Sequence, residues 1–295
     1  MIIVKLMGGL GNQMFQYALG RRLALERGVP LKLDLSWFDS HDKRKFELDQ
    51  FNIEAEIAAR EEIEKFPPFS RNRLLRGVYN RIERRIPYHA RIVFREQSTG
   101  DFDPRVLKIN GNRVLEGYWQ SEKYFSEIRG ILLREFVFKY EQDAKSREMA
   151  EQIQKKESVS LHIRRGDYVH DPLINQIHGL CSFDYYQKAV NYITEKMPNC
   201  HFYIFSDDHS WVCENFKLDY PVTLIDHNNA SRNYEDLRLM SLCRHNIIAN
   251  STFSWWGAWL GTNPGKIVIA PQKWFNDVAR DTKDLIPEYW VKIRV

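Results

Sequence analysis

The chain opens with IIVKLMGGLGNQM (residues 2–14), where a short apolar run leads through glycines into a segment of helical character. Residues 2–6 have the composition of a buried strand, residues 12–27 that of a helix, and residues 31–33 that of a second strand. This order of strand, glycine turn, helix and strand predicts a β-α-β unit with parallel strands.

The same alternation begins again in the second half of the chain. Apolar strands are predicted at residues 158–163, 201–205, 222–225, 246–249 and 266–270, with room for helices between them. Such alternation indicates an α/β fold with parallel sheets covered on both faces. At 295 residues the chain is long enough for two domains. We therefore predict two Rossmann-like domains whose sheets face a central cleft, with ligands at the carboxyl ends of the strands.

The domain boundary is predicted from a charged, helix-forming segment at residues 140–157, which has few residues able to pack on both sides. We place residues 1–148 in an N-terminal domain and residues 149–295 in a C-terminal domain, both Rossmann-like.

The composition excludes several classes of protein. With 43% hydrophobic and 28% charged residues the chain is globular rather than disordered or fibrous. A net charge of +4 favours anionic ligands without requiring nucleic acid, so we expect no nucleic-acid partner. No stretch approaches the roughly 20 apolar residues of a membrane span, and the first residues lack the basic segment of a signal peptide. A cytoplasmic protein is expected.

The strongest chemical signal is His162-Ile163-Arg164-Arg165-Gly166-Asp167-Tyr168, which begins where the predicted strand 158–163 ends. Two arginines at the carboxyl end of a strand can hold a pyrophosphate through bidentate hydrogen bonds, and they stay charged at any working pH. If the bond that breaks joins a sugar to a nucleoside diphosphate, such a guanidinium stabilises the charge on the departing β-phosphate. The alternative is that the arginines form surface ion pairs.

Two further motifs follow predicted strands. In Phe205-Ser206-Asp207-Asp208, either aspartate can accept both donors of the Watson–Crick edge of guanine, with a helix N-cap as the alternative role. In the motif that begins Asn250-Ser251-Thr252, the hydroxyls of Ser251 and Thr252 stand at a helix start, which is typical of an anion site. Their alternative role is also capping.

The amino-terminal glycines leave another function class open. From Gly9 they match the dinucleotide fingerprint G-x-G-x-x-G, except that Met14 replaces the third glycine. Asp34 stands near the end of the second strand, where a ribose-binding acid would lie. A nicotinamide-dependent oxidoreductase therefore remains an alternative. A noncatalytic carbohydrate-binding protein is another, although it would have no use for two adjacent arginines.

No metal site is expected. The four cysteines have no Cys-x-x-Cys or Cys/His metal spacing, so we expect reduced thiols. Asp101-Phe102-Asp103 matches the D-x-D pattern by which many glycosyltransferases hold a metal–nucleotide complex. It runs into Pro104, however, and lacks a preceding strand that would project both carboxylates together.

Taken together, five motifs resemble those of the α-1,2-fucosyltransferases of glycosyltransferase family 11, in family order and over nearly the whole chain. They are Gly8–Gln16, Gly117–Ser121, His162–Tyr168, Phe205–Asp208 and Asn250–Leu260. The resemblance implies a GT-B architecture, GDP-β-L-fucose as donor, a galactose-terminated glycan as acceptor and inversion at the anomeric carbon. It also implies that no metal or other cofactor is required.

The resemblance further implies roles for single residues. Arg165 would hold the β-phosphate, with His162 and Arg164 shaping the same pocket. Inversion requires the galactose 2-hydroxyl to attack opposite the departing GDP, which a general base would assist. Asp167 is the candidate base nearest to the arginines, but its carboxylate could instead orient Arg164 or Arg165.

On the acceptor side, Gly9, Gly11 and Asn12 match the amino-terminal motif that borders fucose and acceptor in related fucosyltransferases. Tyr118 and Trp119 offer aromatic faces on which a galactose ring could stack. For these two residues core packing is the alternative.

An arginine-rich stretch between residues 71 and 95 departs from the family's simpler members, with eight arginines against one acid, Glu83. It is either a solvated helical face or a surface that meets anionic lipid headgroups or a lipid-linked pyrophosphate acceptor. If the stretch is a surface that meets lipid or a lipid-linked acceptor, it predicts peripheral contact with the inner face of the plasma membrane and a role in surface polysaccharide (O-antigen) synthesis.

Overall fold

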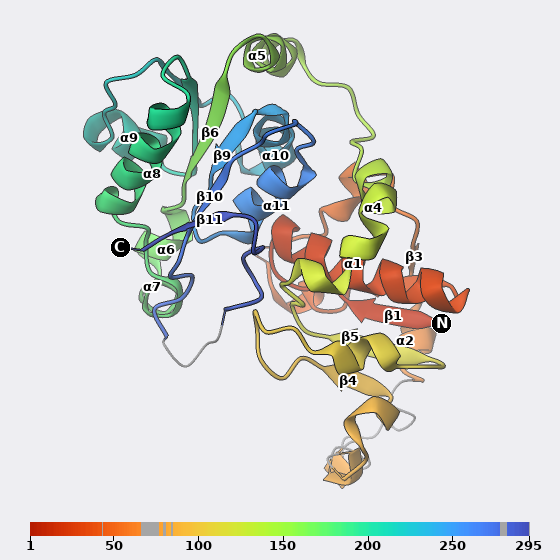
Figure 1. Ribbon diagram of the computed structural model, residues 1–295. Coiled ribbons are helices and arrows are strands. Elements are labelled where there is room, and N and C mark those ends of the chain that lie inside the picture. The colour runs from red at the N-terminus through yellow and green to blue at the C-terminus, as the bar shows by residue number, and fades with distance from the viewer. Residues whose placement is uncertain (43, 66–76, 79–80, 84, 278–281, 295) are drawn as a thin grey trace. The chain divides into compact units, whose positions relative to one another are not determined.

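The computed structural model describes the chain except for residues 43, 66–76, 79–80, 84, 278–281 and 295. The chain forms two compact units, each containing a parallel sheet and helices (Figure 1). Unit 1 comprises Met1–Lys139 and Asp281–Leu285, and unit 2 comprises Tyr140–Arg280 and Ile286–Val295. The predicted boundary at 148/149 falls inside a single helix, α5 (Ala144–Lys155), which belongs wholly to unit 2.

In unit 1 the described residues form a five-stranded sheet in the order β3-β2-β1-β5-β4. Its strands are β1 (Ile2–Lys5), β2 (Leu31–Asp34), β3 (Glu56–Ile57), β4 (Val93–Arg95) and β5 (Arg113–Glu116), and its α-helices are α1 (Leu10–Arg27), α2 (Arg60–Ile63) and α4 (Arg129–Glu135). Each pair of neighbouring strands is parallel. After β1 the chain continues to β2, which pairs with one edge of β1, while β5 pairs with the other edge of β1. The loops that follow β1 and β5 therefore part at the carboxyl edge, where ligands bind in open α/β sheets.

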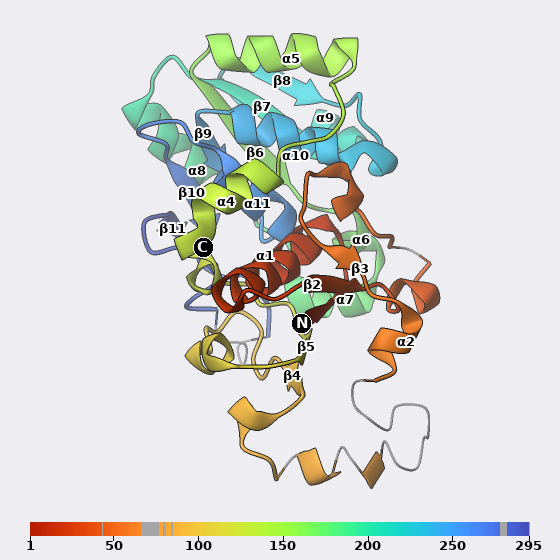
Figure 2. The same ribbon diagram turned by 90° about the vertical axis from the view of Figure 1, so that its right-hand side faces the viewer.

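The helix α1 lies along this sheet, against β1 and β2 (Figures 1 and 2). The close approach depends on Gly20, because a Cβ atom at this position would lie 2.4 Å from Val4 Cγ2 and 2.9 Å from Leu31 Cδ1. The helix ends at Gly28, whose φ of 59° is the left-handed conformation typical of a helix terminus.

In unit 2 the described residues form a six-stranded parallel sheet in the order β11-β10-β9-β6-β7-β8. Its strands are β6 (Ser158–Ile163), β7 (His201–Ser206), β8 (Val222–Ile225), β9 (His245–Ile247), β10 (Val268–Pro271) and β11 (Val291–Ile293). Besides α5, its helices are α6 (Gly166–His170), α7 (Pro172–His178), α8 (Phe183–Lys196), α9 (His209–Asn215), α10 (Asn233–Leu242) and α11 (Thr252–Leu260). From β6 the chain builds the sheet outwards through β7 and β8, and it then returns to β9 on the other side of β6. The loops after β6 and β9 therefore also part at the carboxyl edge, as those after β1 and β5 do in unit 1.

Both faces of this sheet are covered, as predicted. Val159, Leu161 and Ile163 of β6 pack in one cluster with α8 and α9, and Tyr203 and Phe205 of β7 pack in another with α5 and α10. Figure 1 shows α8 and α9 on one side of the sheet and α10 on the other. Alternate residues of a strand point to opposite faces, which explains the continuous apolar run at residues 202–205 of β7.

The structure corrects one assignment of the sequence analysis, because part of the C-terminal region belongs to unit 1. Asp284 accepts hydrogen bonds from the backbone N–H of Phe102 at 3.0 Å and from Lys123 Nζ at 2.6 Å, while its carbonyl accepts from Ser121 Oγ. Leu285 is fully buried. None of the described helices is long and apolar enough to span a bilayer.

The contact of α1 with the sheet gives a test of the fold. Gly20→Ala should lower the free energy of unfolding by about 1–3 kcal/mol, because the new methyl group overpacks against Val4 and Leu31. Gly130→Ala is the matched control. It also replaces a helical glycine of unit 1, but the nearest side-chain atom lies 3.9 Å from the new Cβ, so stability should stay equal or rise. Urea denaturation measures both, and equal effects would contradict the packing described here.

Candidate functional site

The two arginines of the strongest motif lie directly after β6, at the edge where the sheet of unit 2 reverses direction. Arg164 Nη1 pairs with Asp207 Oδ2 at 2.7 Å, and Arg164 Nη2 pairs with Asp167 Oδ1. Its guanidinium is largely buried, and it lies 5.4 Å from the centre of the Tyr168 ring. Arg164 is therefore fixed between two carboxylates.

Arg165 is held by α9 and the residues before it. Its Nε donates to Asp208 Oδ2 at 3.1 Å, and its guanidinium lies 3.8 Å from the centre of the Trp211 ring. Its backbone N–H donates to Asp207 Oδ1 at 2.8 Å. Of the five N–H donors of this guanidinium, only the one on Nε bonds a residue in the described part of the chain, so the head group keeps donors for an anion.

Gly166 makes this arrangement sterically possible. A Cβ atom here would lie 2.4 Å from Asp207 Oδ2, the oxygen that pairs with Arg164. A side chain at this position would displace the carboxylate that orients both arginines. The close approach at Gly166 is thus to Asp207.

The geometry of Asp207 and Asp208 differs from the predicted recognition of guanine. Asp208 is the N-cap of α9, accepting from the backbone N–H of Trp211 at 3.2 Å, while its other oxygen bonds Arg165. This is the capping role that the sequence left open. Asp207 bonds Arg164 and the backbone of Arg165. Both carboxylates orient arginines, and the prediction that either reads guanine has no support from these contacts.

His162 is buried at the end of β6. Burial lowers the pKa of its imidazole to about 4, and the positive charge of Arg164 acts in the same direction. The ring is thus neutral at physiological pH. Its Nδ1 has no hydrogen-bond partner among the residues that the structure describes, and the ring centre lies 6.0 Å from that of Phe253 in α11. The predicted catalytic role of His162 remains a prediction, and in the free protein the ring is a neutral group.

Ser251 and Thr252 begin α11, directly after the strand that pairs with β6. Ser251 is the N-cap residue, yet its side chain makes no capping hydrogen bond, and the first turn holds no acidic residue. The loop is fixed by Asn250, whose Nδ2 donates to the carbonyls of His178 and Trp274. The end of β6 and the start of α11 are therefore neighbours. A helix start next to arginines is an arrangement that favours an anion.

The sequence analysis missed Asp236, near the start of α10. Burial raises the pKa of its carboxyl to about 7, against a hydrogen bond at 2.8 Å from Asn228 Nδ2 that lowers it. The helix α10 packs against α11. Asn228 is itself buried, and its Oδ1 has no partner in the described part of the chain. In the sequence Asp236 resembles an ordinary acidic residue of a first helical turn, so no signal distinguished it.

In unit 1 the structure brings the two predicted acceptor-side motifs together at the carboxyl edge. Asn12 Oδ1 accepts from Gln120 Nε2 at 2.9 Å, and Gln16 Nε2 donates to the carbonyl of Gly117 at 3.1 Å. Gly9 is the N-cap of α1, and Gly11 is buried in its first turn. The roles of Gly9, Gly11 and Asn12 towards substrate stay predictions.

The prediction that Trp119 presents a stacking face is wrong for this structure. Trp119 is fully buried, its φ is 56°, and its ring packs edge-on against Tyr124 at 5.8 Å. The turn is held by Glu96, whose carboxylate accepts from the backbone N–H of Tyr118 and of Trp119 at 2.7 and 2.9 Å. Burial raises the pKa of Glu96 to about 7. Tyr118 is half-buried, and its proposed stacking remains a prediction.

The carboxylates of the D-x-D pattern are engaged within unit 1. The carboxylate of Asp103 accepts two hydrogen bonds from Arg105, from Nε and from Nη2, both at 2.8 Å. Asp101 pairs with Lys283 at 3.0 Å. Of the arginine-rich stretch, residues 71–76, 79–80 and 84 lie outside the described residues. Arg95 pairs with Glu83 and Glu116, whereas Arg81 and Arg85 are exposed.

Comparison with known proteins places this geometry in context. A family model described as glycosyl transferase family 11 matches residues 93–294. The chain is 36% identical to an α-1,2-colitosyltransferase of Escherichia coli, over 99% of this chain and 98% of that protein. It is 33% identical to the O-antigen biosynthesis glycosyltransferase WbnK of the same species, over 98% and 99%.

Among solved structures, the α-1,6-fucosyltransferase NodZ co-crystallised with GDP is 13% identical. Its similarity covers 91% of this chain and 94% of that one, with a TM-score of 0.53. At this identity the likeness concerns the fold, and it supports the predicted GT-B type of architecture.

The buried carboxyl of Asp236 predicts a pH dependence of stability. Because its pKa is raised to about 7, the folded protein holds a proton that the unfolded chain releases near pH 4. The stabilisation of the folded state by this proton is fully present below about pH 4 and is lost as the pH rises through about 7. Asp236→Asn mimics the protonated form. Relative to wild type it should gain stability between pH 5 and 7, by at most about 1.4 kcal/mol per pH unit.

Urea denaturation at pH 5, 6 and 7 measures this difference. Asp184→Asn neutralises an exposed carboxylate of α8 in the same unit and serves as the control. If the curves of wild type and Asp236→Asn ran parallel, the assignment of a proton to Asp236 would be refuted.

Proposed function

Since the chain belongs to glycosyl transferase family 11, we propose that it transfers L-fucose from GDP-β-L-fucose to the 2-hydroxyl of a terminal galactose. The product is an α-1,2 linkage formed with inversion, in the synthesis of O-antigen or a related surface polysaccharide. The observation that carries the proposal is the pair of oriented arginines after β6, beside the start of α11. The similarity to WbnK supports the O-antigen context.

In this proposal unit 2 binds the GDP moiety. Arg165 holds the β-phosphate through the donors that Asp208 leaves unused, Arg164 adds positive charge, and the N–H groups and hydroxyls of Ser251 and Thr252 bind phosphate oxygens. These groups stabilise the negative charge that develops on GDP as its bond to fucose breaks. With arginine in this role, no divalent ion is required.

Recognition of guanine is assigned to a different carboxyl from the one first predicted. Asp207 and Asp208 would have to release their arginines to bind a base. Asp236 is free of such an ion pair with the two arginines. Its carboxylate can accept both donors of the Watson–Crick edge, with Asn228 beside it.

The chemical step follows from these roles. The oxygen of the galactose 2-hydroxyl attacks the anomeric carbon from the face opposite GDP, the bond from that carbon to the β-phosphate oxygen breaks, and the hydroxyl proton passes to a base or water. Asp167 pairs with Arg164, which favours an orienting role over that of a base. Neutral His162 lies near the end of β6, the strand that precedes Arg164. In this proposal the side chain of Asn12 lies next to the reacting sugars from the acceptor side.

A second donor sugar is favoured by one comparison. The relative with 36% identity over nearly its full length is named an α-1,2-colitosyltransferase. Colitose lacks the 3-hydroxyl that fucose carries, so the two donors differ at one position of the ring. Transfer of colitose by the same site and with the same linkage is therefore the alternative function.

A lipid-linked acceptor and peripheral contact with the membrane remain part of the proposal. They rest on the arginine-rich stretch between residues 71 and 95, of which Arg81 and Arg85 are exposed. Neutralising three of these arginines should lower activity on a lipid-linked acceptor more than on a free one.

Calorimetry of GDP binding in EDTA tests the donor site. Wild type should bind GDP without a divalent ion and should not bind NAD. Arg165→Ala should weaken GDP binding about 10- to 100-fold, since hydrogen bonds to a charged group are worth roughly 1.5–3 kcal/mol. Arg244→Ala removes an arginine of unit 2 that pairs with Glu157, and it should bind GDP like wild type. NAD binding, or GDP binding indifferent to Arg165, would return the oxidoreductase and lectin alternatives to consideration.

Competition between donors tests the sugar. We expect kcat/KM for GDP-fucose to exceed that for GDP-colitose at least tenfold, because a site that hydrogen-bonds a hydroxyl discriminates against a ligand without it. Equal amounts of both donors with a galactoside acceptor, analysed by mass spectrometry of the products, give the ratio directly. A ratio in favour of colitose would establish the alternative function.

A further inference from the structure

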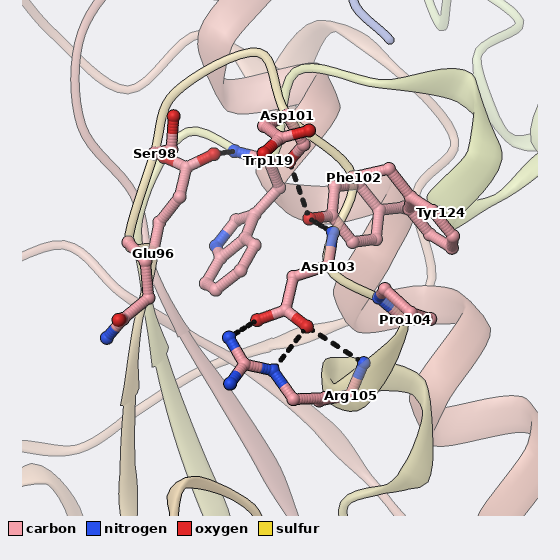
Figure 3. Close-up of a pocket in the computed structure, with 10 residues that line it drawn as sticks. Glu96, Ser98, Asp101, Phe102, Asp103, Pro104, Arg105, Trp119 and Tyr124 are labelled. Carbon is pink, nitrogen blue, oxygen red and sulfur yellow. Dashed lines mark hydrogen bonds and ion pairs between the residues drawn. The ribbon is translucent and has the colours of Figure 1, made fainter. Parts of the chain in front are cut away.

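Unit 1 contains a cavity of about 160 Å³ that the proposed donor site does not use. Glu96, Ser98, Asp101, Asp103, Trp119 and Tyr124 are among its lining residues (Figure 3). The volume is well below the roughly 300 Å³ at which pockets for drug-sized ligands begin. A ligand that fills it is therefore about one small ring in size.

The carboxylate of Glu96 is held in a fixed position in this lining. Each of its oxygens accepts one backbone N–H, from Tyr118 and from Trp119, and burial is tight because a Cβ atom on Gly117 would lie 2.4 Å from Glu96 Cβ. No ion pair to a cation is formed by Glu96 in the described part of unit 1. Each oxygen keeps a second lone pair, so the carboxylate can accept hydrogen bonds from a ligand.

Trp119 supplies an unused donor at the same cavity. Its indole Nε1 is buried and has no hydrogen-bond partner among the described residues. Figure 3 shows the indole ring between the side of the cavity formed by Glu96 and the carboxylate of Asp103. A buried N–H without a partner is costly, and so is a φ of 56° for a bulky residue. Both costs are expected where a ligand supplies the missing partner.

The remaining charges of the lining are compensated. Asp103 forms a bidentate ion pair with Arg105, and Asp101 is paired with Lys283. The cavity is thus rich in hydrogen-bond acceptors and carries no uncompensated positive charge, which disfavours a phosphate. Aromatic rings of Phe102 and Tyr124 complete it. A neutral, polyhydroxylated ring matches this combination, because each hydroxyl both donates and accepts.

We infer that this cavity is a subsite for one neutral pyranose ring of the acceptor glycan, in which Glu96 accepts a hydrogen bond from a ring hydroxyl and Trp119 Nε1 donates one. The identity of the ring as part of the acceptor rests on the proposed function. Binding of the ring itself rests only on the cavity within unit 1.

The test follows the indole N–H of Trp119 by NMR in the full-length, ¹⁵N-labelled protein. The chain has eight tryptophans, and the peak lost in Trp119→Phe assigns the one of interest. Titration with methyl β-D-galactopyranoside should shift this peak in a saturable way, and inorganic phosphate should not. A peak that stays unmoved at galactoside concentrations that saturate transfer would overturn the inference.

Two variants examine the same contacts by saturation-transfer difference NMR of the galactoside. Glu96→Gln should weaken binding at least tenfold, whereas Glu116→Gln, which neutralises a carboxylate of the neighbouring strand outside the cavity, should not. Glu96→Gln also disturbs the turn at Tyr118. Trp119→Phe keeps that backbone and removes a donor without a described protein partner, so it should weaken binding as well. Unchanged binding in both variants would refute the subsite.

Failure of this inference is distinguishable from failure of the proposed function. GDP binding is measured separately and should be unchanged in both variants. A shift of Trp119 in a protein that does not bind GDP would leave the subsite standing and remove the transferase. Fucose transfer with the Trp119 peak unmoved would refute the subsite and leave the transferase function standing.

Discussion

The central strand of each sheet, β1 in unit 1 and β6 in unit 2, is hydrogen-bonded to the next strand of its sheet on one side and to a later strand on the other. Parallel strands need crossover connections, and where these change direction the loops at the carboxyl edge must part. This constraint places residues far apart in sequence next to one another: Tyr168 beside Asn250 in unit 2, and Asn12 beside Gln120 in unit 1.

At the edge of unit 2, positive charge is oriented before any ligand binds. Asp207 bonds Arg164 through one oxygen and the backbone of Arg165 through the other, and the backbone of Gly166 leaves room for it. Partly buried charges are tolerated because they are paired, and the loss of one partner exposes the other to the full cost of desolvation. The aspartates that looked like ligand-binding groups are thus engaged by the two arginines.

The sequence predicted the parts of the fold that have a periodic apolar pattern. Residues 158–163 and 202–205 are buried, and the alternating apolar residues of the first segment and the apolar run of the second both predict strands. The short strand β4 (Val93–Arg95) could not be found, because three residues beside an arginine-rich stretch carry no periodicity. The position of Arg164 and Arg165 at the carboxyl edge was predictable, because they directly follow a strand. The burial of Trp119 was open, because it follows from a positive φ and from a hydrogen bond that its backbone N–H donates to a distant glutamate. Asp236 was missed, because its environment is built by α10, α11 and the loop of Asn228, which no local pattern encodes.

The return of residues 282–285 to unit 1 has a consequence for evolution and for protein engineering. The chain passes between the units at 139/140, again near 280, and a third time at 285/286. A chimaera made by joining two family members at a single junction would carry Lys123 and Ser121 from one parent and Asp284 from the other. Exchange of a complete unit between family members therefore requires two separate segments, one of them only a few residues long, and shuffling at one crossover point yields mismatched halves.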